Sequence, residues 1–279
     1  MLWGERLTAG PNGEAGARAL LAIADALGAS ETEGAGLLEV PAAANGRGLR
    51  EAGILPNAGP GLAPAGAADG LGARQIAEGL AAGSLSALYL LQADPLLELG
   101  DRTLWERALP KAATVIAHAS FMTETIREHA DVVFPAEVYA EKEGTVVHPD
   151  GRIQRLRPAI AKAGEVRAGW QVISELALRL GRDLDVLSGA GASRMLFDSV
   201  PFYAGLTLEE IAGRGVRWQE RAAASEFPTA ELGASAPALV APGEDAAEME
   251  GYRSVWDAPE VEHSPALEFL HPHRDMVRG

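Results

Sequence analysis

Three short apolar runs, each ended by polar or proline-bearing residues, constrain the fold more than any other feature of the chain. The runs predict strands at 85–91, 114–117 and 132–134, with helices between them at 102–109 and 123–129. Such runs are typical of parallel strands buried in a layered protein, and their order implies right-handed crossovers. We therefore predict an α/β fold with a mostly parallel sheet and a site at the carboxyl ends of its strands.

The pattern changes after the third run. Two β-rich segments at 145–147 and 152–156 flank a turn signal at 149–151, which predicts a hairpin projecting from the carboxyl edge of the sheet. An amphipathic helix is predicted at 169–180, and Ser193 is placed to cap a further helix.

Domain boundaries follow from these patterns and from composition. Residues 1–185 are predicted to form one α/β domain, in which an amphipathic helix at 13–27 packs into the core. Residues 34–72 are punctuated by glycine and proline and predict a long loop. A helical extension is expected at 186–221. The composition of 222–279 is too polar to offset its ordering entropy, so we expect a poorly ordered linker and tail.

Composition also excludes several classes of protein. The 39 acidic and 24 basic residues give a net charge of −15, which disfavours nucleic acid as a partner. No apolar run approaches the ~20 residues that cross a bilayer, so we expect no direct membrane insertion. With no cysteine, this chain can supply no thiolate to an iron–sulfur cluster or to molybdenum. It has no P-loop, no H-E-x-x-H motif and no G-x-G-x-x-G after a strand.

The motif residues resemble a known family. The segment LLQADP at 90–95, followed by HASFMTETIREHADVVFPAEVYAEKEGTVVHPDGRIQ at 118–154, looks like the molybdopterin oxidoreductase superfamily. Within it, the similarity points to the large iron–sulfur subunit of bacterial NADH-quinone oxidoreductase, respiratory complex I. Residues 41–61 also resemble a segment of that large subunit. The resemblance implies a formate dehydrogenase-like fold, of which residues 1–185 would be a partial domain in a C-terminal fragment.

The resemblance further implies a vestigial pterin cleft at the carboxyl edge of the sheet. The cofactor-binding residues that it predicts are Gln92, Ala93, Asp94, Pro95, His118, Thr123, Glu141, Lys142, Gly144 and Thr145. The superfamily carries a loop of the type Gly-x-Asn-Pro at residues 92–95, and the aspartate found here would repel a pyrophosphate. Gly144 would permit a close backbone approach. No catalytic residue and no metal ligand is predicted, because neither Glu141 nor Glu143 has a partner at a recognised spacing.

Each predicted contact has a structural alternative. Residues 92–95 could form a turn that proline holds in place, and His118 could be a hydrogen-bonded structural residue rather than a base or a ligand. Thr123 opens a helix whose N–H groups could hold an anion, or it could be part of a simple cap. Residues 141–145 could support the domain edge. Residues 41–61 could be a vestigial cofactor loop, a partner-facing loop or a surface loop held by glycines.

Three hypotheses for function follow. In the first, the chain is a fragment of the large iron–sulfur subunit and a redox-inactive scaffold without a cofactor, while NADH:quinone oxidoreduction belongs to the complex. Its partners would be the other peripheral-arm subunits and the missing N-terminal part of the same polypeptide, which would carry the iron–sulfur clusters. It would lie in the cytoplasm, peripheral to the cytoplasmic face of the bacterial inner membrane. The second is a fragment of a molybdopterin-dependent enzyme such as formate dehydrogenase, with molybdopterin as cofactor. The third is a stand-alone nucleotide-binding α/β module.

Overall fold

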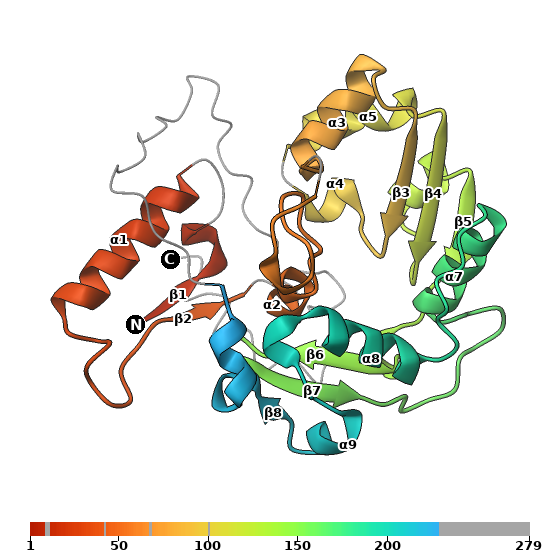
Figure 1. Cartoon of the computed structure of the whole chain (residues 1–279). Helices are drawn as coiled ribbons and strands as arrows, with labels where there is room; N and C mark the ends of the chain where they lie inside the picture. The colour runs from red at the N-terminus through yellow and green to blue at the C-terminus, as the bar shows by residue number, and fades with distance from the viewer. Residues whose placement is uncertain (9–11, 42, 67–68, 100, 229–279) are drawn as a thin grey trace, which may run out of the picture.

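The computed structural model describes residues 1–8, 12–41, 43–66, 69–99 and 101–228 (Figure 1). Within these ranges the strands form three small sheets, in the orders β1-β2, β3-β4-β5 and β6-β7-β8. Helices lie between and over them, so the predicted α/β class is confirmed. No helix among these residues has the length and apolar character needed to cross a membrane.

The middle sheet has the predicted parallel topology. Its strands lie side by side in chain order and both pairs are parallel (Figure 1). The helices α3 and α5 precede and follow the first strand of this sheet. The bounds of these elements are α3 (Ala73–Ala82), β3 (Ala87–Leu91), α5 (Arg102–Ala108), β4 (Thr114–Ala119) and β5 (Val132–Pro135).

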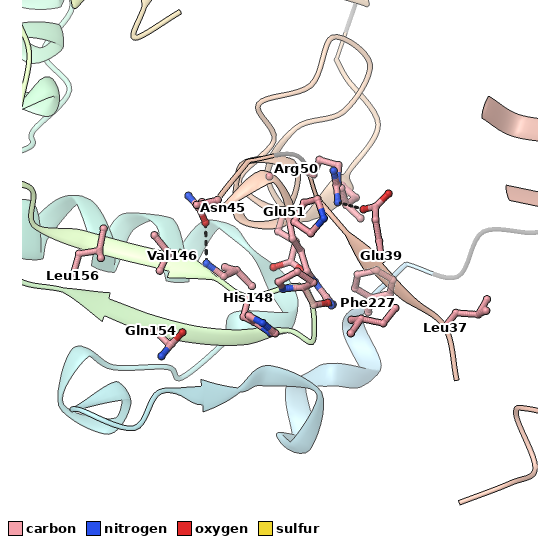
Figure 2. Close-up of a pocket in the computed structure, with 18 of the residues that line it drawn as sticks. Leu37, Glu39, Asn45, Arg50, Glu51, Val146, His148, Gln154, Leu156 and Phe227 are labelled. Carbon is pink, nitrogen blue, oxygen red and sulfur yellow. Dashed lines mark hydrogen bonds and ion pairs between the residues drawn. The ribbon is translucent and has the colours of Figure 1, made fainter. Parts of the chain in front are cut away.

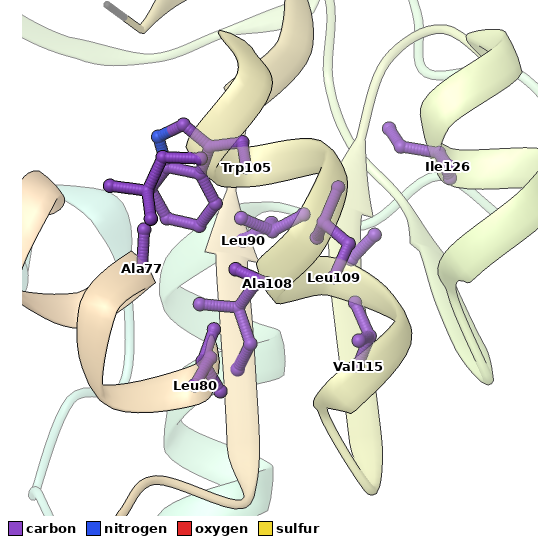
Figure 3. Close-up of a cluster of buried hydrophobic side chains, with 11 residues drawn as sticks. Ala77, Leu80, Leu90, Trp105, Ala108, Leu109, Val115 and Ile126 are labelled. Carbon is purple, nitrogen blue, oxygen red and sulfur yellow. The ribbon is translucent and has the colours of Figure 1, made fainter. Parts of the chain in front are cut away.

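A first hydrophobic core lies between this sheet and the helices α3 and α5 (Figure 3). Leu80 of α3 and Trp105 of α5 face Leu90 of β3, because helical spacing brings their apolar positions to one side. Along β3, however, burial alternates, and Tyr89 and Leu91 are exposed. A buried strand was expected here, but β3 is covered only on the side under α3 and α5.

The predicted hairpin is present and belongs to a second sheet. Strands β6 (Gly144–Val147) and β7 (Arg152–Leu156) are antiparallel, and β8 (Val216–Arg217) pairs with β7. A second core covers this sheet with side chains from α8 (Gly189–Ser199) and α9 (Leu208–Ile211) and from the segments beside them. The buried residues of this core are Val147, Ile153, Phe197, Val200, Phe202, Tyr203, Leu206, Ile211 and Trp218.

The predicted cap of α8 was misplaced. Ser188 is the N-cap, and its hydroxyl accepts a hydrogen bond from the backbone N–H of Gly191 at 2.9 Å. Ser193 lies inside the helix, buried, and its hydroxyl donates to the carbonyl of Gly189. The helix therefore starts earlier than expected, through a glycine-rich turn whose low helical propensity concealed it.

The N-terminal part of the chain differs most from expectation. Strands β1 (Leu2–Gly4) and β2 (Leu38–Val40) are parallel, with α1 (Gly13–Ala26) between them in sequence. The apolar face of α1 was expected to pack into the core, yet Leu21 and Leu27, which lie on that face, are exposed. A sheet of two three-residue strands offers too small a face to bury a helix of this length.

The long loop predicted at 34–72 contains β2 and also α2 (Gly46–Glu51). Tertiary contacts stabilise this helix despite its glycines. Its N-cap Asn45 accepts a hydrogen bond from the backbone N–H of Val147 at 2.8 Å, which ties α2 to β6. A Cβ at Gly48 would come within 2.2 Å of the Asn45 amide oxygen, so this close approach requires glycine.

The last described residues pack on the second core. Residues 222–226 form a short 3₁₀ helix, and the ring of Phe227 stacks on Trp218 with centroids 5.2 Å apart. The boundaries predicted at 185 and 221 remain predictions. The poorly ordered tail expected from the sequence falls mostly at 229–279, outside the described residues.

Candidate functional site

The loops that follow β3, β4 and β5 bring the predicted site residues together. The Lys142 ammonium donates a hydrogen bond to the side-chain oxygen of Gln92, which lies 50 residues earlier in the chain. The backbone N–H of Gln92 donates to the carbonyl of His118 at 2.8 Å. Gln92 adopts a positive φ of 51°, an uncommon conformation for a residue with a side chain. The carboxyl edge of the parallel sheet is therefore cross-linked by polar side chains.

Asp94 is turned into the protein rather than toward solvent. Its side chain accepts a hydrogen bond from the backbone N–H of Leu96 at 3.0 Å, so it caps the short helix α4 (Pro95–Glu98). The Thr123 hydroxyl donates to its other oxygen at 2.5 Å. Both carboxylate oxygens are thus occupied, and Pro95 beside them is buried. These contacts give residues 92–95 the geometry of a capped turn.

Thr123 also caps its own helix, α6 (Glu124–His129). Its hydroxyl oxygen accepts a hydrogen bond from the backbone N–H of Ile126 at 3.4 Å. Thr125 lies inside the helix and is buried, so Thr123 is the residue that caps it. One threonine therefore joins the loop after β4 to the loop after β3.

Two buried carboxylates, those of Glu141 and Glu137, hold the loop after β5. The oxygens of Glu141 accept hydrogen bonds from the backbone N–H groups of Val138 at 3.0 Å and Ala163 at 3.1 Å. Of the other predicted residues in this loop, Gly144 and Thr145 begin β6, where they pair with β7. Gly144 has a φ of +146°, which favours glycine although an added Cβ would meet open space.

Glu137 is a site residue that sequence reasoning missed. One of its oxygens pairs with Lys162 at 3.0 Å, and the other accepts from the backbone N–H of Gly169 at 3.2 Å, where α7 (Gly169–Arg179) begins. It is buried and lies beside His118. Its partners lie many residues later in the chain, so no local spacing could have revealed it.

His118 occupies the centre of the edge and is completely buried, with 0% of its surface exposed. Neither ring nitrogen has a hydrogen-bond partner among the residues that the structure describes. The ring meets Phe134 edge-on, with centroids 6.3 Å apart. Burial lowers the pKa of His118; Glu137 opposes this shift, and the nearby cations Lys142 and Arg167 add to it. The imidazole is therefore neutral at neutral pH.

This buried histidine predicts a pH-dependent stability. Because its folded pKa lies below that of the unfolded chain, about 6.5, the unfolded state takes up more protons as the pH falls. The stability that comes from keeping His118 neutral is fully present above the unfolded pKa. It is lost as the pH falls toward the lower folded pKa, by at most about 1.4 kcal/mol per pH unit. Between about pH 7.5 and 5.5, His118→Gln should therefore lose less unfolding free energy in urea titrations than the wild type. Equal losses in the two proteins would contradict this account.

A cavity of about 660 Å³ lies between β2, α2 and the hairpin β6–β7 (Figure 2). None of the ten predicted cofactor residues lines it. The exposed Tyr139 does, from the loop after β5, so the cavity adjoins the carboxyl edge. Residues 41–61 contribute one wall through α2, and whether they form a cofactor loop, a partner-facing loop or a surface loop stays a prediction. Sequence reasoning missed the contribution of β7, whose residues Gln154 and Leu156 form the opposite wall.

The chain is similar to several known oxidoreductases. The family profile described as molybdopterin oxidoreductase matches residues 1–179. The alpha subunit of the NADPH-Fe(3+) oxidoreductase of Geobacter sulfurreducens is 35% identical over 73% of this chain and 25% of its own length. The alpha subunit of an F420-dependent formate dehydrogenase of Methanococcus maripaludis is 33% identical, over 47% of this chain and 20% of its own.

One subunit of an NADH-quinone oxidoreductase from Rhizobium meliloti is 34% identical, over 48% of this chain and 16% of that protein. The chain therefore spans about a quarter or less of the length of these three relatives.

Proposed function

Because this chain belongs to the molybdopterin oxidoreductase family, we propose that it is a scaffold segment of the large iron–sulfur subunit of an NADH-quinone oxidoreductase, without a redox centre of its own. Its similarity to the Rhizobium meliloti protein supports the assignment. Relatives named as formate dehydrogenase and as NADPH-Fe(3+) oxidoreductase match comparable or larger parts of the chain. Sequence similarity alone thus leaves these three assignments open, and the geometry of the carboxyl edge favours the scaffold.

The observation that carries this proposal is the use of the predicted cofactor residues for internal contacts. Asp94 caps a helix, Glu141 binds two backbone N–H groups, and Lys142 is held by Gln92. A pterin nucleotide would bring a pyrophosphate, which needs unpaired donors or positive charge. A buried aspartate lies instead where the superfamily carries an asparagine.

The charged side chains at the carboxyl edge of the sheet fit the pyrophosphate of a pterin nucleotide poorly. Lys162 is paired with Glu137 at 3.0 Å and Arg167 with Glu175 at 2.8 Å. Lys142 is the third cation; burial lowers its pKa, and its ammonium is already held by the side-chain oxygen of Gln92. The carboxylates in the same loops compensate these cations. The residues present therefore do not fit a pterin pyrophosphate, and the chain has no cysteine to bind a metal beside it.

Exposed apolar side chains on the same edge support a role in an assembly. Phe121 and Met122, after β4, are 73% and 52% exposed, and Leu97, after β3, is 67% exposed. Apolar groups that remain exposed next to a polar edge are typical of protein interfaces. We propose that they contact other peripheral-arm subunits or the N-terminal part of the parent protein, at the cytoplasmic face of the inner membrane. Oxidoreduction of NADH and quinone would then belong to the assembled complex.

The alternative is a segment of a molybdopterin-dependent formate dehydrogenase, which the similarity to the Methanococcus maripaludis protein favours. In that case the carboxyl edge would have to open so that Lys142 and Gln92 separate and face a nucleotide. Molybdopterin would supply the redox chemistry, and this chain would contribute backbone and side-chain contacts to the nucleotide part.

Purification from native cells distinguishes the two assignments. The scaffold proposal predicts that other complex I subunits co-purify with the protein, and that the protein segment itself binds no molybdenum or tungsten and releases no pterin after denaturation. Mass spectrometry and elemental analysis give the readouts. Formate dehydrogenase partners together with stoichiometric molybdenum or tungsten would reject the proposal in favour of the alternative.

Matched variants locate the interface. Replacing Phe121 and Met122 together by serine is expected to reduce co-purification, because it removes exposed apolar surface without touching a core. Leu187→Ser is the control, since Leu187 is 86% exposed but lies between α7 and α8, outside the loops that follow β3, β4 and β5. An equal reduction by both variants would argue against an interface at the carboxyl edge.

A further inference from the structure

The cavity between β2, α2 and the hairpin has the dimensions of a small-molecule site. Its volume of about 660 Å³ lies within the range of about 300–1,000 Å³ usual for ligand pockets. Its walls are mainly apolar: Trp3 comes from β1, Leu38 from β2, Val146 and Leu156 from the hairpin, and Phe227 from the segment after β8. Side chains from segments far apart in the sequence therefore surround one space (Figure 2).

The carboxylates that line the cavity are already occupied. Glu51 accepts hydrogen bonds from Arg47 at 2.8 Å and from the hydroxyl of Tyr203. Glu39 accepts from Arg50 at 3.1 Å and from the hydroxyl of Thr8 at 3.1 Å. A ligand that relied on hydrogen-bond donors would therefore have to displace existing contacts, at a cost in binding energy.

Donors, in contrast, remain available in the lining. The indole nitrogen of Trp3 has no partner within the described part of the chain, but it has almost no accessible surface and so does not face the open space of the cavity. The Arg50 side chain is 41% exposed, and its guanidinium uses one of five N–H groups on Glu39. Figure 2 shows Arg50 and Glu39 joined at the rim of the cavity. Arg50 is therefore a side-chain donor that a ligand in this cavity can reach.

The charges of the lining restrict the ligand further. Arg47 and Arg50 are balanced by Glu39 and Glu51, so the cavity has no excess of positive charge for a phosphate chain. From the geometry we infer that this cavity binds a small planar aromatic molecule carrying a single carboxylate. The ring would lie against the apolar walls, and the carboxylate would accept hydrogen bonds from the N–H groups of Arg50 that Glu39 leaves free. The site is separate from the carboxyl-edge residues and does not depend on the scaffold proposal.

Titration with 2-naphthoate tests this inference. In ¹⁵N-labelled protein, the indole N–H resonance of Trp3 is expected to shift saturably, with a Kd on the order of 1 mM for a ligand of this size. The resonance of Trp105, buried in the first core, should not move and serves as the internal control. An amine of the same shape, 2-naphthylmethylammonium, should bind at least about tenfold more weakly because it offers no acceptor to Arg50 and adds a like charge beside it.

Three variants locate the site. Arg50→Met keeps much of the side-chain length but removes the charge, so 2-naphthoate should bind about tenfold more weakly. Leu156→Trp fills the cavity, so 2-naphthoate should no longer shift the indole resonance of Trp3. Arg102→Met is the matched control, because Arg102 also pairs with a glutamate at 2.8 Å but lies on α5, and it should leave binding unchanged. Thermal unfolding of each variant checks that it is folded.

Several results would overturn the inference. These are the absence of a saturable shift at Trp3, equal binding of the ammonium compound, or an unchanged Kd in Arg50→Met. Tighter binding of adenosine diphosphate at the same resonance would reject the ligand class and indicate a phosphate site. A shift in Leu156→Trp as large as in the wild type would place the ligand elsewhere.

Discussion

Replacing Glu51 by alanine is expected to lower the free energy of unfolding by about 3–5 kcal/mol. The Glu51 side chain is only 4% exposed and pairs with Arg47 at 2.8 Å, while the buried Tyr203 donates its hydroxyl hydrogen to the other oxygen. Without the carboxylate, a largely buried guanidinium and a buried phenol would both lose their partners. The cost of leaving such groups unpaired exceeds the value of the contacts themselves.

The effect should be large because this carboxylate joins distant parts of the fold. Arg47 also donates to the carbonyl of Pro149 in the hairpin turn and lies 5.3 Å from the ring centre of Trp218. Glu51 therefore holds α2 on the second core through residues up to 152 positions away. Burial and the neighbouring carboxylate raise the pKa of Tyr203, so the phenol remains a donor at neutral pH.

Urea unfolding at neutral pH measures the difference. Glu106→Ala is the control, since Glu106 forms the same i,i+4 pair with Arg102 at 2.8 Å on an exposed surface, and its loss should cost less than about 0.5 kcal/mol. Glu51→Gln should fall between the two, because the amide keeps the acceptor for Tyr203 but loses the charge. Similar stabilities for Glu51→Ala and Glu106→Ala would refute the assignment of Glu51 as a buried clamp.

The sequence predicted the middle of the fold well because its signals are local. The runs that became β3, β4 and β5 are continuous and apolar and are ended by polar or proline-bearing residues, so their positions agree within two residues. The hairpin was equally clear, since Gly151 at φ +84° is a turn residue that few other side chains could replace.

The contacts around α2 could not be predicted in this way. Two of the six residues of α2 are glycine, which local propensity assigns to a loop. What stabilises α2 is the pairing of Glu51 with Tyr203 and of Asn45 with Val147, across separations of 152 and 102 residues. No pattern within one segment contains that information.

The candidate site, too, was predictable where its signals are local and unpredictable where it depends on long-range contacts. The resemblance correctly led to loops that meet at one edge, where Lys142 contacts Gln92 and Thr123 contacts Asp94. Whether these residues bind a cofactor remains a prediction. Glu137 and the cavity were missed, because both depend on how separate segments come together rather than on a motif. Long-range contacts thus decide whether a loop with a family motif faces a ligand or faces the protein.

Truncating Trp105 to alanine is the second change with a large expected effect, about 3–5 kcal/mol, as for other buried aromatic residues. Trp105 is 2% exposed and packs in the first core against α3 and β3 (Figure 3). Phe202→Ala is the matched change in the second core, where Phe202 contacts the rings of Tyr203, Trp218 and Phe227. Each substitution should cost a similar amount of unfolding free energy.

Hydrogen exchange then shows whether the two cores unfold together. They form separate clusters of buried side chains, so Trp105→Ala should reduce amide protection in β3 and β4 while β7 keeps most of its own. Phe202→Ala should produce the reverse pattern. Loss of protection in both sheets after either substitution would mean that the segments joining β5 to β6 couple the two cores into one cooperative unit.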